Sequence, residues 1–270
     1  MLSSIPCGDL ELNVGHPHGT PTLVPSIGLE QRLDIRLIPR PRTPENETRL
    51  AIHLHVFYLD TLEALLRPLI ACKQGLGDFD LWISTDSSSK AAALTQAIQQ
   101  SSLMEKIQAL EVKVCANRGR NLGPLLLDLW PQLKSYNLLL HLHGKRSVET
   151  DLGSNWLEEL LSTLLPNAAT VADLRERFSL NPSLGLVMPQ APEVIRPYLN
   201  WGNNFELARQ LTRAWHTTPL SREAVLLFPA GMMFWCRPNS LEPLAELVST
   251  LGELPPEPKT MDGTSLHALE

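Results

Sequence analysis

The chain has 270 residues, of which 43% are hydrophobic and 19% are charged, so it can bury a sizeable core. This composition excludes a disordered chain, a collagen and a disulfide-stapled miniprotein. The formal net charge of -6 gives no support for a general basic face, so we expect no nucleic-acid partner.

Residues 1–48 differ from the rest because they hold seven of the 22 prolines. Proline lacks the amide hydrogen and disfavours helical geometry in the residue before it, so residues 39–44 cannot form a helix. We predict a Pro-rich N-terminal arm or linker over 1–48, in which Leu29–Ile38 could form one short strand. The remaining residues, 49–270, are predicted to form one domain.

From residue 50 onward, strand and helix patterns alternate. Apolar runs predict strands over 50–58, 79–84, 110–116 and 136–143. Apolar residues at helical spacing predict helices over 59–72, 89–100 and 122–133. This alternation predicts an α/β fold with a mostly parallel, Rossmann-like sheet flanked by helices.

The second half of the domain is less regular. Its pattern predicts helices over 155–164, 168–178, 239–251 and 262–270, a strand over 184–188 and a broken strand over 225–236. Asp262 could cap the last helix. The chain ends inside that helix without a Gly or Asn cap, so we expect that the natural protein is longer.

The segment 115–124 follows a predicted strand and opens a predicted helix. Ligands of doubly wound sheets collect at the carboxyl ends of strands, where Gly119 would let the backbone approach a ligand and Asn121 could cap the helix. Arg118 and Arg120 add cations suited to phosphate, although an ordinary tight turn with two solvated arginines is the alternative. The predicted diphosphate-binding residues of this segment are Asn117, Arg118, Gly119, Arg120 and Asn121.

Two predicted strands each carry a His-x-His pair, His53 with His55 and His141 with His143. Alternate residues of a strand face the same side, so four imidazoles could meet if the strands are neighbours. They would then form either a zinc-like site or hydrogen-bonded core histidines, and we favour the core interpretation for His53 and His141. The end of the later strand extends the predicted diphosphate site with His143, Gly144, Lys145 and Arg146, because cations there can neutralise a leaving diphosphate.

Two further segments could contact a sugar. Trp201 offers a flat apolar face, and Asn203 beside Gly202 could read hydroxyl groups, although a loop turn with an anchored Trp is the alternative. In the apolar segment 228–237, Gly231 suggests a close backbone approach within what otherwise looks like a buried strand.

Eight segments, taken in order, resemble the rhamnan synthesis protein F family over about residues 50–270. They read AIHLHVFY, FDLWIST, NRGRNLGPLL, LLLHLHGKRS, LGLVMP, WGNN, FPAGMMFWCRP and DGTSLHALE. The resemblance implies a divergent GT-A-type glycosyltransferase that takes part in making rhamnose-containing cell-surface polysaccharides. It further implies a nucleotide-sugar donor such as dTDP-rhamnose, and a glycan or lipid-linked glycan as the acceptor.

The chain departs from the GT-A pattern in one respect that affects the cofactor. Many GT-A enzymes carry an Asp-X-Asp motif at the end of the fourth strand to hold a divalent metal, whereas this chain reads His141-Leu142-His143 there. Magnesium and manganese favour oxygen ligands, so we expect Arg and Lys side chains, and not a metal, to neutralise the charge of the diphosphate. A metal held by histidines is the less favoured alternative. Members of this family usually have Asp at the position of Asn121.

By the same resemblance, the catalytic base should be a carboxylate near the start of a late helix, which makes Asp262 the first candidate and His267 the second. Asp60 and Asp86 are the alternatives. The residues predicted to contact sugar or acceptor are His55, Asp86, Trp201, Gly202, Asn203, Gly231 and Trp235. A catalytically inactive sugar-nucleotide or glycan-binding module, and a histidine-ligated metal hydrolase, are the competing functional classes.

The expected location is the cytoplasm, with attachment to the inner face of the membrane as an open alternative. The N-terminus lacks the basic and apolar regions of a secretory signal, and no run approaches about 18 apolar residues. The four cysteines form no CxxC motif, and a reducing compartment suits them best.

Overall fold

The computed structural model describes residues 2–6, 49–144, 152–191, 193, 196, 199–214, 220–223, 226–252, 254–255 and 262–270. Most of the predicted N-terminal arm lies outside these residues. The same is true of Lys145 and Arg146, two of the predicted diphosphate ligands.

The described strands form one sheet in the order β1-β6-β7-β5-β2-β3-β4. The strands are β1 (Leu2–Pro6), β2 (Leu50–His55), β3 (Phe79–Thr85), β4 (Ile107–Val114), β5 (Leu138–His143), β6 (Leu184–Pro189) and β7 (Phe234–Cys236). Parallel pairs join β2 to β3, β2 to β5 and β3 to β4, while β7 runs antiparallel to both β5 and β6. This confirms the predicted α/β class with a mostly parallel sheet.

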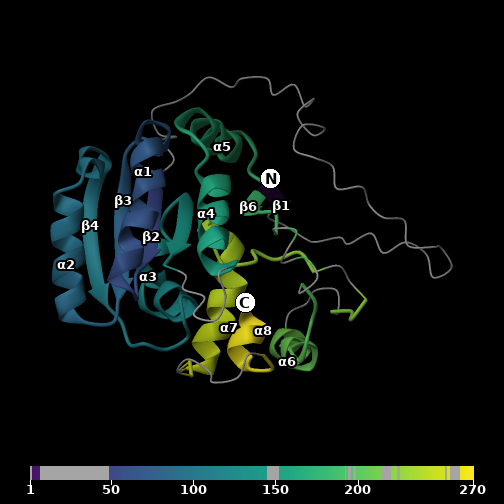
Figure 1. The fold of residues 1–270 in the computed structure, drawn as a ribbon. Helices are drawn as coiled ribbons and strands as arrows, with labels where there is room; N and C mark the ends of the chain where they lie inside the picture. The colour runs from purple at the N-terminus through teal and green to yellow at the C-terminus, as the bar shows by residue number, and fades with distance from the viewer. Residues whose placement is uncertain are drawn as a thin grey trace.

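Helices cover both faces of this sheet (Figure 1). The first face is covered by α1 (Leu62–Leu76), α2 (Ser88–Gln99), α4 (Leu152–Leu164) and α5 (Ala168–Leu180). The second face is covered by a π-helical turn (Pro124–Asp128), α3 (Trp130–Leu133), α7 (Glu242–Leu251) and α8 (Ser265–Leu269). A further helix, α6 (Phe205–Leu211), contacts α8 at one end of the sheet, as Figure 1 shows.

Strand β5 shows how the alternation of side chains divides the core. Leu138, Leu140 and Leu142 pack into the cluster of the first face, whereas Leu139 belongs to the cluster of the second face. Because side chains alternate along a strand, His141 and His143 face the same side as Leu139. The second face is therefore apolar at the start of β5 and polar toward its end. We call the side of the sheet on which the parallel strands reach their C-terminal residues the carboxyl edge.

Several predicted elements have different bounds in the structure. The predicted helix 122–133 is a π-helical turn followed by the four-residue α3, since Pro124 and Pro131 each remove a backbone donor. The predicted strand 225–236 is a strand only at Phe234–Cys236, where the chain has left the Pro229–Gly231 break. The predicted strand 50–58 ends at His55.

Strand β1 pairs antiparallel with β6 over residues that lie within the predicted Pro-rich arm or linker. Its five residues carry little strand signal of their own, and its partner lies far away in the sequence. Pairing with β6 is a tertiary effect that local patterns do not report.

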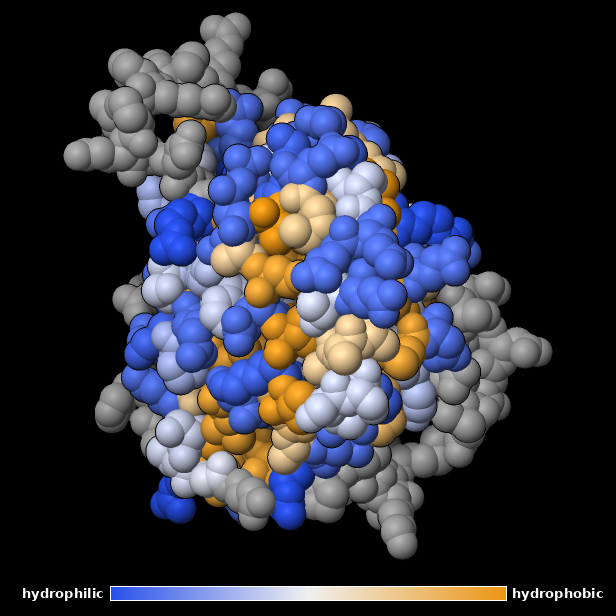
Figure 2. Space-filling model, turned by 90° about the vertical axis from the view of Figure 1, so that its left-hand side faces the viewer, coloured by the Kyte–Doolittle hydropathy of each residue, from blue (hydrophilic) through white to orange (hydrophobic). Residues whose placement is uncertain are grey.

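Strand β4 is the opposite border of the sheet, and its side chains are mostly exposed or half-buried. Charged residues such as Glu111 and Lys113 on an edge strand discourage pairing with another chain. Figure 2 shows this side of the molecule, where apolar residues appear between polar ones. Among the described residues, no helix combines the length and the apolar character needed to cross a membrane.

Candidate functional site at the carboxyl edge of the sheet

The loop after β4 has a backbone that only a glycine fits at one position. Gly119 has φ of +68°, and a Cβ added to it would lie 2.4 Å from Cδ1 of Leu254. Its N–H donates to the carbonyl of Pro255 at 2.9 Å, which fixes the loop against the segment before α8. The next residue, Arg120, also has a positive φ of 51°, which is uncommon for a residue with a side chain and often marks a functional position.

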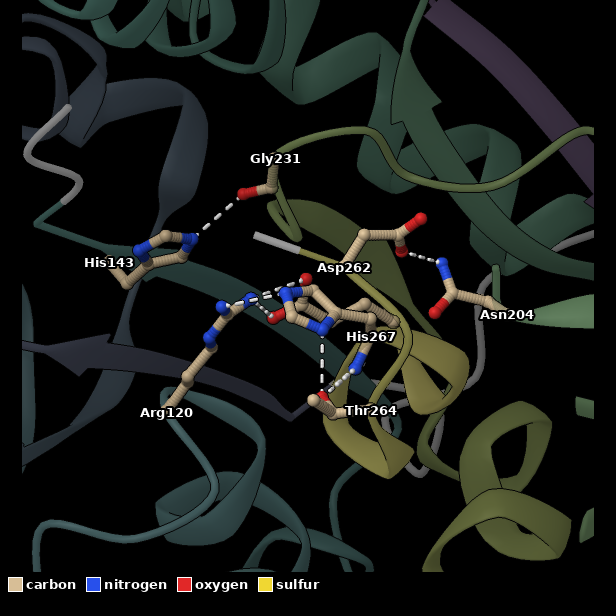
Figure 3. Close-up of polar contacts among 8 residues, drawn as sticks. Arg120, His143, Asn204, Gly231, Asp262, Thr264 and His267 are labelled. Carbon is tan, nitrogen blue, oxygen red and sulfur yellow. Dashed lines mark hydrogen bonds and ion pairs between the residues drawn. The ribbon is translucent and has the colours of Figure 1, made fainter. Parts of the chain in front are cut away.

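Arg120 connects this loop to α8 (Figure 3). Its guanidinium donates to both carboxylate oxygens of Glu270, at 2.9 and 3.0 Å, and to Nε2 of His267 at 3.1 Å. Since Arg can only donate, Nε2 of His267 must accept, and Nδ1–H then donates to Oγ1 of Thr264 at 2.7 Å. Both ring nitrogens of His267 are therefore engaged.

Asp262 joins the start of the last helical segment to the 200–204 loop. Its carboxylate accepts hydrogen bonds from the backbone N–H of Asn203 at 2.8 Å and from Nδ2 of Asn204 at 2.5 Å. The first of these bonds is the largest cause of the lowered pKa of Asp262, because it stabilises the charged carboxylate. A Cβ on Gly202 would lie 2.2 Å from Oδ2 of Asp262, so only glycine permits this approach.

The predicted capping role of Asp262 is wrong. The N-cap of α8 is Thr264, whose hydroxyl accepts from the backbone N–H of His267. Asp262 precedes the cap by two residues and faces the 200–204 loop instead (Figure 3). Its carboxylate is thus held by another part of the chain and not by its own helix.

His143, at the end of β5, contacts the turn before β7. Its Nε2–H donates to the carbonyl of Gly231 at 2.7 Å, and Gly231 has φ of +89°. The backbone of Gly231 does approach another group closely, as the sequence indicated. Figure 3 shows this pair across from Arg120 and His267, so the ends of β4 and β5 and the start of α8 frame one region.

The remaining histidines lie on the sheet itself. His53 and His141 are fully buried, stack with ring centroids 4.9 Å apart, and share a hydrogen bond of 3.0 Å between their Nδ1 atoms. Burial lowers the pKa of both rings well below the usual value, so both are neutral. The core interpretation of this pair is confirmed. Among the described residues, no group of three or more His, Cys, Asp or Glu side chains could hold a metal ion.

His55 and Asp86 lie near the ends of β2 and β3. Nδ1 of His55 is 2.9 Å from Oγ of Ser84, and burial lowers the pKa of His55 to about 4. Asp86 forms an ion pair of 2.6 Å with Lys90, whose ammonium also donates to the carbonyl of Phe57 at 2.7 Å. Asp60, the other alternative base, is exposed.

A hollow of about 590 Å³ lies beside the 200–204 loop. Its lining includes Trp201 and Gly202 from that loop, and Arg222 and Glu223 from the segment opposite. The indole N–H of Trp201 donates to the carbonyl of Ser221 at 3.2 Å, which holds the ring in place. Gly202 is the lining residue that also lies against Oδ2 of Asp262.

Two predicted roles are corrected by the structure. Trp235 is fully buried in the first-face core, and its indole N–H donates to the carbonyl of Leu164, so it packs in the core and faces no ligand. Asn121 does not cap the helical segment that begins at Leu122, because its side-chain oxygen accepts no hydrogen bond among the described residues. Oδ1 of Asn121 is instead buried without a partner among the described residues.

The other predicted residues occupy the ends of β4 and β5. Asn117 and Arg118 are exposed in the loop after β4. Gly144 comes directly after β5 and lies against Thr61, so that an added Cβ would be 2.0 Å from the Thr61 hydroxyl. Three contributors were missed as site residues: Ser84, Asn204 and Thr264. Glu270 also contributes, and its ion pair with Arg120 has no signal in the local sequence.

Taken together, the fold and this site define an α/β protein whose polar side chains gather where its parallel strands end, which is the usual ligand position in open sheets. The family model described as rhamnan synthesis protein F matches residues 28–270, so the chain belongs to that family. The match begins at residue 28, whereas the resemblance in the sequence motifs begins at about residue 50.

Two curated relatives are proteins of two strains of Xanthomonas campestris pv. campestris, both named uncharacterized protein WxcX. Each is 30% identical to this chain over 242 residues, which cover 85% of this chain and 32% of the relative. The chain therefore spans about a third of the length of these relatives.

Proposed function

We propose that this domain is a GT-A-type glycosyltransferase that moves a sugar, rhamnose in particular, from a nucleotide-sugar donor to a growing cell-surface polysaccharide. Membership of a rhamnan synthesis family supports a role in polysaccharide biosynthesis. The observation that carries the proposal is the arrangement of Arg120, His143 and Asp262 around the carboxyl edge of an open, mostly parallel sheet.

The loop after β4 would bind the donor diphosphate. Nη1 of Arg120 already donates to both carboxylate oxygens of Glu270, and the oxygens of a phosphate could accept from the same group. The exposed Arg118 lies two residues away, and Lys145 and Arg146 follow the end of β5 in sequence. These cations would stabilise the negative charge that develops on the leaving diphosphate. We propose no metal in this role.

Asp262 is the proposed base. The acceptor hydroxyl oxygen would form a bond to the anomeric carbon while the bond from that carbon to the diphosphate oxygen breaks and its electron pair leaves with the diphosphate. The hydroxyl proton would pass to Asp262, which its lowered pKa keeps ionised at neutral pH. His267 is less suited, because Arg120 occupies the lone pair of its Nε2.

The hollow beside the 200–204 loop would hold the acceptor. Trp201 offers an aromatic face, and the neighbouring Asn200, Arg222 and Glu223 offer groups that hydrogen-bond to sugar hydroxyls. A glycan or a lipid-linked glycan would present such hydroxyls. A lipid-linked acceptor would place the domain at the inner face of the membrane, in the cytoplasm.

A second candidate is an inactive module that binds a sugar nucleotide or a glycan. It is favoured by the observation that Arg120 and Asp262 are both already engaged by protein groups, Glu270 and the Asn203–Asn204 pair. Release of the nucleoside diphosphate from dTDP-rhamnose without acceptor separates the two candidates. A transferase should show slow release that Asp262→Asn reduces, whereas a module should bind the donor and leave it intact.

A further inference from the structure

Four polar side chains form a continuous chain across three strands of the sheet. Nδ1 of His141 on β5 is 3.0 Å from Nδ1 of His53 on β2, and Nε2 of His53 is 2.9 Å from Oγ of Ser84 on β3. Oγ of Ser84 is in turn 2.9 Å from Nδ1 of His55. Strand register produces this order, because His53 lies opposite His141 and His55 lies opposite Ser84.

Each neutral imidazole carries one N–H, and the Ser84 hydroxyl has one donor and two acceptor lone pairs, so three arrangements place one proton in every link. In one of them Ser84 accepts from both His53 and His55, and its own O–H, which is fully buried, then has no acceptor among the described residues. In the other two, every donor points from His141 toward His55, or every donor points the opposite way. In the former, His55 accepts at Nδ1 and carries its proton on Nε2; in the latter it carries its proton on Nδ1.

The two ends of the chain decide between these arrangements. At one end, Nε2 of His141 is buried and has no partner among the described residues. A buried N–H without an acceptor is rarer in proteins than a buried acceptor without a donor, so this atom should carry no proton. At the other end, His55 is only half-buried in the last position of β2, where an N–H can meet water or a ligand.

We propose that the chain His141–His53–Ser84 fixes His55 as an Nε2–H donor at the carboxyl edge, where it binds an oxygen of the nucleotide-sugar donor. This proposal rests on the proposed function and specifies one contact of that site. His55 touches the ligand, whereas Ser84, His53 and His141 are positioning residues. Because the pKa of His55 is about 4, the ring stays a neutral donor throughout the physiological pH range.

The test measures the tautomer of His55 directly, by long-range proton–nitrogen correlation NMR on protein labelled with ¹⁵N-histidine. The expected result for the natural chain is an Nε2-protonated His55, and Ser84→Ala should convert it to a mixture of tautomers. Ser84→Thr keeps the hydroxyl and should restore the natural state. Thr85→Val is the matched control, because it removes the neighbouring buried hydroxyl, which has no partner among the described residues.

Titration with dTDP then tests the ligand contact. We expect the Nε2–H resonance of His55 to shift on binding, and His55→Phe to weaken dTDP binding about tenfold, as for one lost hydrogen bond to a charged group. An Nδ1-protonated His55, or an unchanged tautomer in Ser84→Ala, would contradict the proposal that the hydrogen bonds from His141 through Ser84 fix the tautomer of His55. Failure of dTDP to bind the natural protein would overturn the proposed function and the ligand contact together, while the tautomer measurement still decides the chain.

Discussion

At the scale of single residues, Asp262 carries the most specific chemical claim. Its two hydrogen bonds from the 203–204 segment orient the carboxylate and keep it charged. Asp262→Asn should lower the rate of sugar transfer by about 100-fold or more, because the acceptor proton loses its base, while donor affinity changes little. Steady-state transfer rates and donor calorimetry measure the two quantities. Full activity of the variant would remove Asp262 from the mechanism, and Asp60→Asn tests the exposed alternative.

Arg120 is the second residue whose role can be measured alone. Arg120→Ala should weaken donor binding by about tenfold to 100-fold, the range expected when a charge-assisted hydrogen bond is lost. Arg209→Ala is the matched control, since Arg209 pairs with Glu206 on the exposed side of α6. Equal donor affinity of the two variants in calorimetry would show that Arg120 holds α8 in place and does not bind the diphosphate.

The buried histidines make stability depend on pH. The ordinary pKa of histidine is 6.5, and burial lowers that of His55 to about 4 and those of His53 and His141 also. Below pH 6.5 these histidines bind protons in the unfolded chain but stay neutral in the folded chain. The free energy of unfolding therefore falls as the pH decreases toward 4. The slope is at most about 1.4 kcal/mol per pH unit for each histidine.

Urea unfolding between pH 7.5 and 5 measures this slope. His141→Gln removes one of the titrating groups and should make the decline shallower. An unchanged slope in that variant would mean that His141 is not held neutral by the fold.

At the scale of elements, the loop after β4 depends on Gly119 for both its conformation and its contact with Leu254. Gly119→Ala should lower the free energy of unfolding by about 1–3 kcal/mol, through backbone strain plus the clash with Leu254. Gly252→Ala is a close control, because Gly252 has a similar φ of +71° but nothing within 4 Å of an added Cβ. Urea unfolding of both variants separates the clash from the strain, and equal losses would contradict the contact.

How much of each element the sequence predicts depends on where its partners lie. The strand 79–84 and the helix 168–178 are close to the observed β3 and α5, because apolar spacing and local caps specify them. Pro124 and Pro131 were visible in the sequence, yet a π-helical turn depends on how the segment packs against α7. Asp and Thr are both common N-cap residues, so the sequence alone does not tell whether Asp262 or Thr264 caps α8. The contacts of Asp262 with Asn203 and Asn204 leave the cap to Thr264.

The site itself was predicted in part for the same reason. His143 and Gly231 stand out by type and position, but the sequence does not reveal that one donates to the other across two strands. Ser84 gave no signal, because a serine inside a strand is common and its two histidine partners arise from register alone. Trp235 was misassigned since an aromatic residue near a glycine turn suits a sugar site as well as it suits a core.

At the scale of the whole molecule, the seven described strands bring segments from both halves of the chain to one edge. The loop after β4 and the segment 262–270 are separated by more than half of the sequence, yet the ion pair between Arg120 and Glu270 joins them. The proposed donor site therefore includes a residue, Arg120, whose side chain is held by α8.

Calorimetric titration with a panel of nucleotide sugars, each with and without chelator, tests the central claim most directly. The account predicts that dTDP-rhamnose binds with one site per chain, that chelator leaves this affinity unchanged, and that Arg120→Ala weakens it. Absence of binding by every nucleotide sugar, in a chain shown to be folded by cooperative urea unfolding, would contradict the account.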